Sequence, residues 1–163
     1  MKKITNLILL FSLIISCQKA KVDDRKKQNK NDFSTIELKV ERGAFHNDTF
    51  ILKDTVITFY PEKEQDSDLN QQYYTISEQA ISKSERDLFL QKILDAGIWN
   101  LNEKYTPEDS CTSNVIITIS LTGKTKRIEC EDFVRECPDI IKFIESEMVR
   151  LHGKGLERIF LPG

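Results

Sequence analysis

Residues 115–130 read VIITISLTGKTKRIEC and carry the clearest structural pattern in the chain. Apolar residues recur at every second position on both sides of a Thr-Gly pair, which is typical of two half-buried strands joined by a tight turn. The stretch therefore predicts a β-hairpin whose register is fixed by the turn. The inward-facing pairs expected from that register are Ile117 with Ile128 and Val115 with Cys130.

Further strands are predicted on the N-terminal side of this hairpin. Apolar and polar residues alternate over 35–41, and β-branched or aromatic residues dominate 49–52, 55–60 and 71–76. The polar stretch 62–70 between the last two segments is expected to be a hairpin loop. These segments add several strands to the same sheet.

Two helices complete the predicted domain. Ser82 and Glu85 have the spacing of a capping box, and the apolar stripe that follows stops at Gly97, a residue suited to a helix end. A second helix is expected to open at Pro138 and to end at Gly153. The fold class predicted is α+β, with a single antiparallel sheet of about five to six strands and two helices packed on one face.

The N-terminus has the physical signature of an export signal. Lys2 and Lys3 precede the apolar run 6–16, which is too short to span a bilayer as a mature helix. The segment Ile14-Ile15-Ser16-Cys17 resembles the lipobox of bacterial lipoproteins, which implies that Cys17 is acylated and begins the mature chain. An ordinary secretory signal, with Cys17 present by coincidence, is the alternative.

The lipobox predicts three parts: a signal peptide at 1–16, the acylated cysteine with a disordered tether at 17–33, and one domain at 34–163. The tether contains almost nothing to bury, so it cannot offset its conformational entropy. Gln18 follows the cysteine, where an Asp would resemble an inner-membrane retention signal. We therefore expect a location at the outer membrane, facing the periplasm or the cell surface.

The charge balance bears on the class of partner. Without Lys2 and Lys3 the chain has 22 basic and 26 acidic residues, a net charge of −4. Domains that bind nucleic acid usually carry a clustered basic stripe, whereas Lys and Glu are interspersed here. The expected partners are the membrane, through the lipid on Cys17, and a protein, but not nucleic acid.

The order of predicted elements resembles a group of small uncharacterised domains found on bacterial lipoproteins. Many of those domains carry a Gly-x-Cys-Pro segment in the first turn, where this chain has Gly43-Ala44-Phe45-His46. The layout is also similar to that of emfourin, an inhibitor of thermolysin-like metalloproteases, in which a Gly-Phe turn follows the first strand. The local match is limited to Arg42-Gly43-Ala44-Phe45, so the resemblance implies no inhibitory residues here.

Three cysteines remain after Cys17 is assigned to lipid, in an export setting that permits disulfides. The hairpin register places Cys111 near Cys137, so we predict a disulfide between these two residues, with Cys130 as a buried thiol. A zinc site that adds His46 or His152 is the alternative, but the spacings contain no C-x-x-C pair.

Catalytic and cofactor signals are weak. His46 and His152 have no nucleophile motif around them, and His152 near a helix end is expected to interact with the helix dipole. No glycine-rich phosphate loop is present, and we expect no cofactor and no metal. The loop Asp66-Ser67-Asp68-Leu69-Asn70 only partly follows a calcium-loop pattern, which requires Gly at its sixth position and Glu at its twelfth. Asp54-Thr55-Val56 resembles a bacterial O-glycosylation acceptor, which would modify Thr55.

These observations favour a membrane-anchored, non-enzymatic binding or interaction module, such as an inhibitor, an immunity protein or a component of an envelope complex. The alternatives are an envelope hydrolase or other enzyme, and a structural lipoprotein. A deep cleft converging on Asp66, Asp68 and His46 would favour the enzyme. A shallow exposed apolar patch would favour a partner surface.

Overall fold

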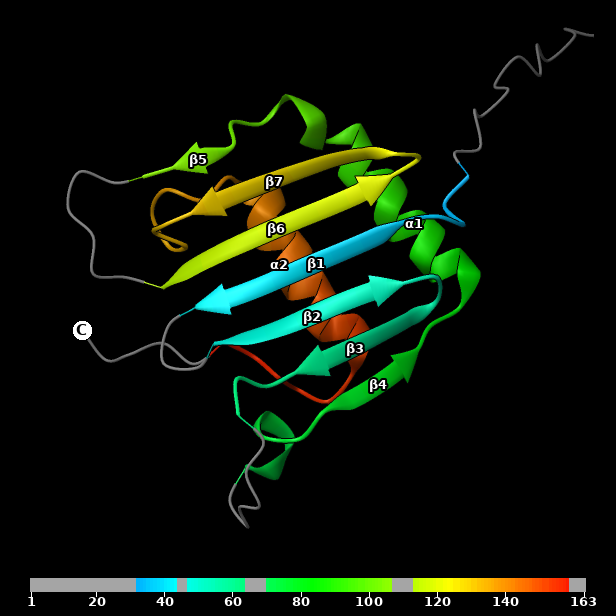
Figure 1. Ribbon diagram of the computed structural model, residues 1–163, viewed down its shortest axis with the longest axis vertical. Coiled ribbons are helices and arrows are strands. Elements are labelled where there is room, and N and C mark those ends of the chain that lie inside the picture. The colour runs from blue at the N-terminus through cyan, green and yellow to red at the C-terminus, as the bar shows by residue number, and fades with distance from the viewer. Residues whose placement is uncertain (1–31, 44–46, 64–69, 107–112, 159–163) are drawn as a thin grey trace, which may run out of the picture. The chain divides into compact units, whose positions relative to one another are not determined.

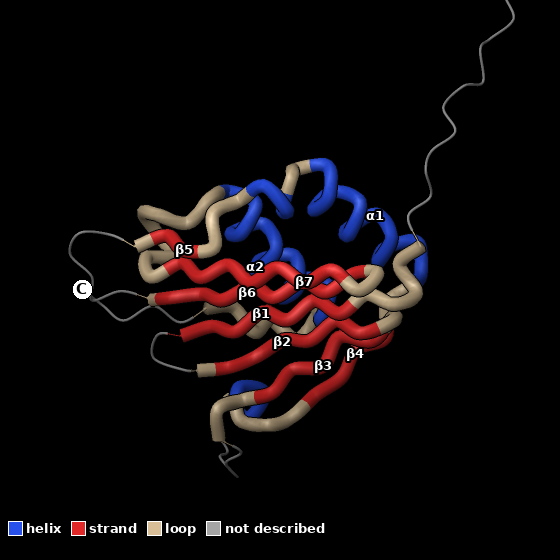
Figure 2. Tube along the Cα trace, turned by 45° about the horizontal axis from the view of Figure 1, so that its top comes forward, coloured by secondary structure: helices blue, strands red, loops and turns tan. Residues whose placement is uncertain are grey.

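The computed structural model describes residues 32–43, 47–63, 70–106 and 113–158. Within these ranges the chain forms one sheet in the order β4-β3-β2-β1-β6-β7-β5, and α1 and α2 cover one of its faces (Figures 1 and 2). The fold class is therefore α+β, as predicted. The strands are β1 Glu37–Gly43, β2 Asp48–Lys53, β3 Val56–Tyr60, β4 Ser77–Ala80, β5 Lys104–Tyr105, β6 Asn114–Leu121 and β7 Lys124–Cys130. The helices are α1 Lys83–Asp95 and α2 Asp139–His152, with 3-10 turns at Gln71–Tyr73 and Ile98–Asn100.

The predicted register of the β6–β7 hairpin is confirmed. Ile117 lies opposite Ile128 and Val115 lies opposite Cys130, and all four side chains are buried. The turn residues Thr122 and Gly123 have φ values of 50° and 78°, the left-handed pair that a two-residue hairpin turn requires. The alternating apolar side chains of the hairpin thus lie on the face of the sheet that the helices cover. On its other edge, β6 pairs with β1.

The sheet differs from the prediction at both edges. The short strand β5 pairs in parallel with β7, so the sheet is mixed and has seven strands within the described residues. The strand predicted at 71–76 is wrong, since Gln71–Tyr73 forms a 3-10 turn and the edge strand β4 begins at Ser77. Local bonds favour the turn, because the Thr75 hydroxyl and the Tyr74 N–H both donate to the carbonyl of Gln71.

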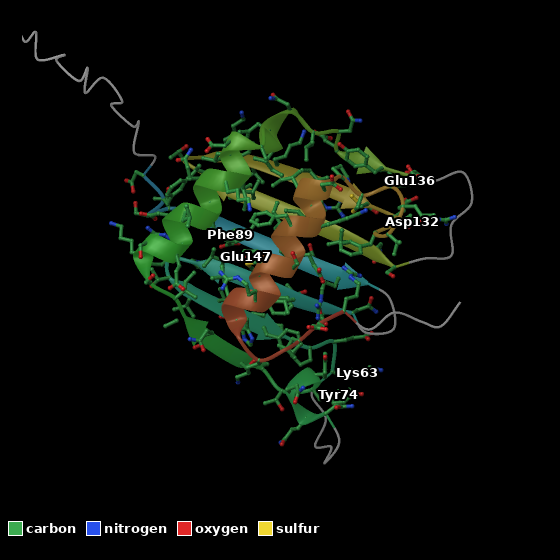
Figure 3. All side chains as sticks on the ribbon, turned by 180° about the vertical axis from the view of Figure 1, so that it is seen from behind. Lys63, Tyr74, Phe89, Asp132, Glu136 and Glu147 are labelled. Carbon is green, nitrogen blue, oxygen red and sulfur yellow. The ribbon has the colours of Figure 1, made fainter. Side chains whose placement is uncertain are left out.

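Both helices begin and end near the predicted positions. In the capping box of α1 the Glu85 N–H donates to the Ser82 hydroxyl at 3.1 Å, and the Glu85 carboxylate accepts the Ser82 N–H at 3.0 Å. Pro138 precedes α2 as its N-cap rather than as its first helical residue. Phe89 of α1, labelled in Figure 3, meets Phe143 of α2 with ring centroids 5.9 Å apart, which joins the two helices.

The folded part begins before the predicted domain boundary. Phe33 is only 4% exposed and belongs to the hydrophobic core. The predicted tether 17–33 therefore wrongly includes Phe33, which is part of the folded domain. The signal peptide, the lipobox and Cys17 lie outside the described residues. Among the helices that are described, none has the length and apolar character needed to cross a membrane.

Candidate functional site

A groove of about 790 Å³ runs along one side of α2. Its first wall is built by side chains spaced three or four residues apart on the helix, an arrangement that places them on one face. Its second wall is the segment 153–158, which turns back from the helix end. The lining includes the apolar Phe133, Phe143 and Val149, the cationic Lys142, Arg150 and Arg158, and the acidic Glu145 and Glu157.

The returning segment 153–158 is held by contacts with distant parts of the chain. Gly153 ends α2 with φ 75°, Leu156 is fully buried, and the Tyr73 hydroxyl donates to the carbonyl of Gly155 at 3.2 Å. Phe133 approaches from the loop after β7, where its N–H donates to the Ser113 carbonyl. These contacts fix the walls of the groove from three separate regions of the sequence.

The loop after β7 is organised by Asp132, which is buried (Figure 3). Its carboxylate accepts the N–H groups of Arg135 and Val134 at 3.0 and 3.1 Å, and these bonds with the Arg135 side chain hold the pKa of Asp132 below its usual value. The Asp132 carbonyl accepts the Cys137 N–H. The loop therefore presents Phe133 to the groove and brings Cys137 back to the end of β7.

Arg158 is the buried cation of this groove, beside the buried carboxylate of Glu145. Its side chain is 5% exposed, and its Nη1 donates to the carbonyls of Asn114 at 3.0 Å and Gly43 at 3.3 Å. The guanidinium lies 4.2 Å from the Phe133 ring centroid. Its Nε lies 3.5 Å from a Glu145 oxygen, beyond good hydrogen-bonding geometry. Among the residues that the structure describes, neither Nε nor Nη2 has a hydrogen-bond partner, and both atoms are buried.

Arg42 at the end of β1 is a second buried arginine, and its donors are satisfied. Its Nε and Nη2 donate to the two carboxylate oxygens of Asp48 at 2.5 Å each, a bidentate pair. Its Nη1 donates to Glu145 at 3.2 Å and to the Leu156 carbonyl at 2.8 Å. Glu145 therefore lies between Arg42 and Arg158 and interacts with both.

The pKa values of the two arginines shift in opposite directions. Burial lowers the pKa of Arg42, but the hydrogen bonds and charges of Asp48 and Glu145 outweigh it and raise the pKa above its usual value. Burial also lowers the pKa of Arg158, and there Glu145 does not outweigh it. Both side chains stay charged because the guanidinium is so basic. The charge of Arg158 is thus the less well compensated of the two.

Gly43 has a structural role beside these arginines. A Cβ atom at this position would lie 1.9 Å from Oδ1 of the Asn114 side chain, so a larger residue would require that side chain to move. Arg42 and Gly43 of the inhibitor-like segment thus belong to the core and to a strand end. Ala44, Phe45 and His46 lie outside the described residues.

The structure brings Cys130 and Cys137 together. Both are free thiols and buried, and their interaction lowers the pKa of Cys130 and, together with burial, raises the pKa of Cys137. Cys111 lies outside the described residues, so the Cys111–Cys137 disulfide stays a prediction. The correct hairpin register did not reveal this contact, because the turn after Asp132 carries Cys137 back towards Cys130.

His152 at the end of α2 is fully buried rather than placed to interact as a cation with the helix dipole. Its Nε2 lies 3.2 Å from the Ser77 hydroxyl, and the Phe50 and Phe59 rings lie beside it. Burial is the main cause that lowers its pKa, so the neutral imidazole is favoured. Its Nδ1 has no hydrogen-bond partner within the described ranges, so no third group is seen there that would orient this Ser-His pair as a catalytic base.

The remaining predicted site residues are separate from the groove. Asp54 and Thr55 form the turn between β2 and β3, where Asp54 has φ 51° and accepts a hydrogen bond from Arg86 at 3.0 Å. Thr55 is partly buried, and its carbonyl accepts the Ile81 N–H. The predicted acidic loop residues Asp66 and Asp68 lie outside the described residues.

Comparison with known proteins gives no family assignment. The chain matches no protein-family model and no curated protein sequence. In the described ranges, no three His, Cys, Asp or Glu side chains lie close enough together to hold a metal ion. The groove and its arginines therefore provide the chemistry from which a function can be argued.

Sequence reasoning missed the groove and both arginines. The sequence does contain one usable signal, because Arg158 stands among the apolar residues Leu156, Ile159, Phe160 and Leu161. A charged residue inside a packed segment needs a partner or a ligand. Arg42 gave no comparable signal, since it directly follows the predicted strand 35–41.

Proposed function

We propose that this chain is a bacterial lipoprotein, held at the outer membrane by acyl chains on Cys17, whose domain acts as a non-enzymatic binding module. The export signal and the lipobox support the anchor, because two or more acyl chains hold a protein stably on a membrane. The expected classes remain an inhibitor, an immunity protein or a component of an envelope complex.

The groove along α2 is the observation that carries the binding role. It combines apolar side chains with one buried guanidinium that has unused donors, which is the composition of a recognition site. A hydrolase is the alternative, and the Ser77–His152 hydrogen bond is the contact that favours it. That pair is packed among aromatic rings and has no orienting carboxylate, so we propose binding rather than catalysis.

The anchor is tested by replacing the acylated cysteine. Cys17→Ser is expected to abolish palmitate labelling and to leave the uncleaved precursor, because the thiol is the acylation site. Cys130→Ser is the matched control and is expected to retain both labelling and processing. Labelling of the Cys17→Ser chain would contradict the lipobox.

The binding surface is tested by photo-crosslinking in intact cells. A photoreactive residue at Ser146, an exposed groove position, is expected to form a specific adduct with an envelope component. The same residue at Thr118, on the opposite face of the sheet, is the control. Equal labelling from both positions, or none from Ser146, would count against the groove and favour a structural lipoprotein.

A further inference from the structure

We propose that the groove along α2 binds a small carboxylic acid with an apolar body, whose carboxylate pairs with Nε and Nη2 of Arg158. The inference rests on the non-enzymatic binding role proposed above and specifies its ligand. The two donors lie on one edge of the planar guanidinium, the edge that accepts a carboxylate in a bidentate manner. In the described structure this edge is buried and has no hydrogen-bond partner, and a Glu145 oxygen lies 3.5 Å from Nε.

Arg42 provides a template within the same molecule. Its Nε and Nη2 are occupied by the two oxygens of Asp48, which is the arrangement we infer for Arg158 and its ligand. A buried donor without a partner loses the free energy of its hydration. An incoming carboxylate restores two charge-assisted hydrogen bonds to Arg158, so binding is favoured at this edge.

The charges around the groove favour a monoanion. Lys142, Arg150 and Arg158 line the groove together with two acidic residues, Glu145 and Glu157, and Arg150 is already paired with Glu147 at 2.7 Å. Glu145 also lies 3.5 Å from the Arg158 Nε, so a doubly charged group such as a phosphate monoester is repelled at close range. A single carboxylate carries less negative charge and is repelled less.

The remaining lining favours an apolar body. Phe143 and Val149 face the groove from the helix and Phe133 closes one part of it, and its volume of about 790 Å³ lies within the range of small-molecule sites. A peptide would bring main-chain amides against these apolar side chains, where amides without partners are costly. A hydrocarbon or aryl group has no such cost.

The test compares ligands that differ in one feature, using the full chain in lipid nanodiscs with empty nanodiscs as the blank. Isothermal titration with 4-phenylbutyrate is expected to show binding about tenfold or more tighter than with 4-phenylbutanol, which has the same body without charge. Butyrate is expected to bind more weakly than 4-phenylbutyrate. Equal affinity for acid and alcohol, or no binding of the acid, would overturn the proposal.

Two variants locate the contact. Arg158→Lys keeps the charge but removes the bidentate edge, and is expected to weaken 4-phenylbutyrate binding by about tenfold or more. Arg127→Lys, on the outer face of the sheet, is the matched control and is expected to leave affinity unchanged. Loss of affinity in both variants, or in neither, would contradict the assignment to Arg158.

The nitrogen resonance of Arg158 Nε gives a readout that does not depend on the variant folding. In wild-type protein, 4-phenylbutyrate is expected to shift this signal, whereas 4-phenylbutanol is expected to leave it unchanged. An unchanged signal under saturating acid would overturn the proposed contact. Failure here leaves the palmitate and crosslinking results intact, so the ligand class and the anchored binding role are tested separately.

Discussion

Two buried arginines within one charged cluster differ in how their donors are used. Arg42 has a carboxylate on its bidentate edge and further acceptors on Nη1, whereas Arg158 makes hydrogen bonds only through Nη1 and has on the equivalent edge, among the described residues, only the longer 3.5 Å contact with Glu145. Burial is similar, with side-chain exposures of 3% and 5%. The two arginines therefore differ in their polar partners and not in their burial. Arg42 belongs to a structural ion pair, whereas we propose that Arg158 is available to a ligand.

The largest expected effect comes from removing the satisfied arginine. Arg42→Met leaves Asp48 and Glu145 buried without their main cation, and is expected to lower the free energy of unfolding by about 3–5 kcal/mol. Urea denaturation measures the change. Arg127→Met removes a half-exposed pair with Glu129, and this control is expected to cost about 1 kcal/mol or less. Equal losses in the two variants would remove the distinction drawn for Arg42.

A smaller effect is expected for the unsatisfied arginine. Arg158→Met keeps an apolar stem of similar length and removes two donors that have no hydrogen-bond partner, but it also removes the Nη1 bonds to the carbonyls of Asn114 and Gly43. Because Glu145 keeps its bond to Arg42, the free energy of unfolding is expected to fall by about 1–2 kcal/mol, less than in Arg42→Met. If urea denaturation gave a loss as large as that of Arg42→Met, both arginines would have to be regarded as structural.

His152 extends the comparison to a buried basic group that is neutral. Its pKa is lowered by burial, so at mildly acidic pH the unfolded chain binds more protons than the folded protein. The stabilising contribution is present above the usual pKa of 6.5 and is lost as the pH falls towards the folded value. Unfolding free energy is expected to drop more in wild type than in His152→Gln between about pH 7.5 and about pH 5. Parallel pH profiles would show that His152 does not titrate with folding.

The smallest effect on stability is expected when the two thiols near Arg158 are joined in a disulfide. Oxidised glutathione is expected to join Cys130 to Cys137 by thiol–disulfide exchange, because both thiols are free and they interact with each other. Non-reducing peptide mapping identifies the link, and Cys130→Ala is the control that should abolish it. A Cys111–Cys137 peptide would instead establish the pairing predicted from the sequence.

Local sequence signals predicted the elements whose bonds are local. The turn at Thr122-Gly123 fixes the register of β6 and β7, and the three-residue spacing of Ser82 and Glu85 sets the start of α1. The strand β5 has no such signal, because two residues carry no periodicity. It is held by residues that are distant in sequence, because the N–H groups of Glu129 and Glu131 donate to the carbonyls of Glu103 and Tyr105.

The groove was not predictable for a related reason. Arg42 finds its partners Glu145 and Leu156 at separations of 103 and 114 residues, and Arg158 meets the strand ends at Gly43 and Asn114. Hydrophobic periodicity indicates which face of an element is buried, but it does not indicate which polar atoms meet there. Polar partners of this kind are determined by the three-dimensional packing of the whole domain.

The short edge strands have a consequence for how copies of the protein behave when crowded. β4 has four residues and β5 has two, so a neighbouring chain finds few consecutive free main-chain donors and acceptors at either edge. The part of β7 beyond β5 carries Lys124, Lys126 and Arg127, and charged edge residues disfavour strand addition. Copies gathered on one surface are therefore expected to stay separate rather than to join edge to edge into a continuous sheet.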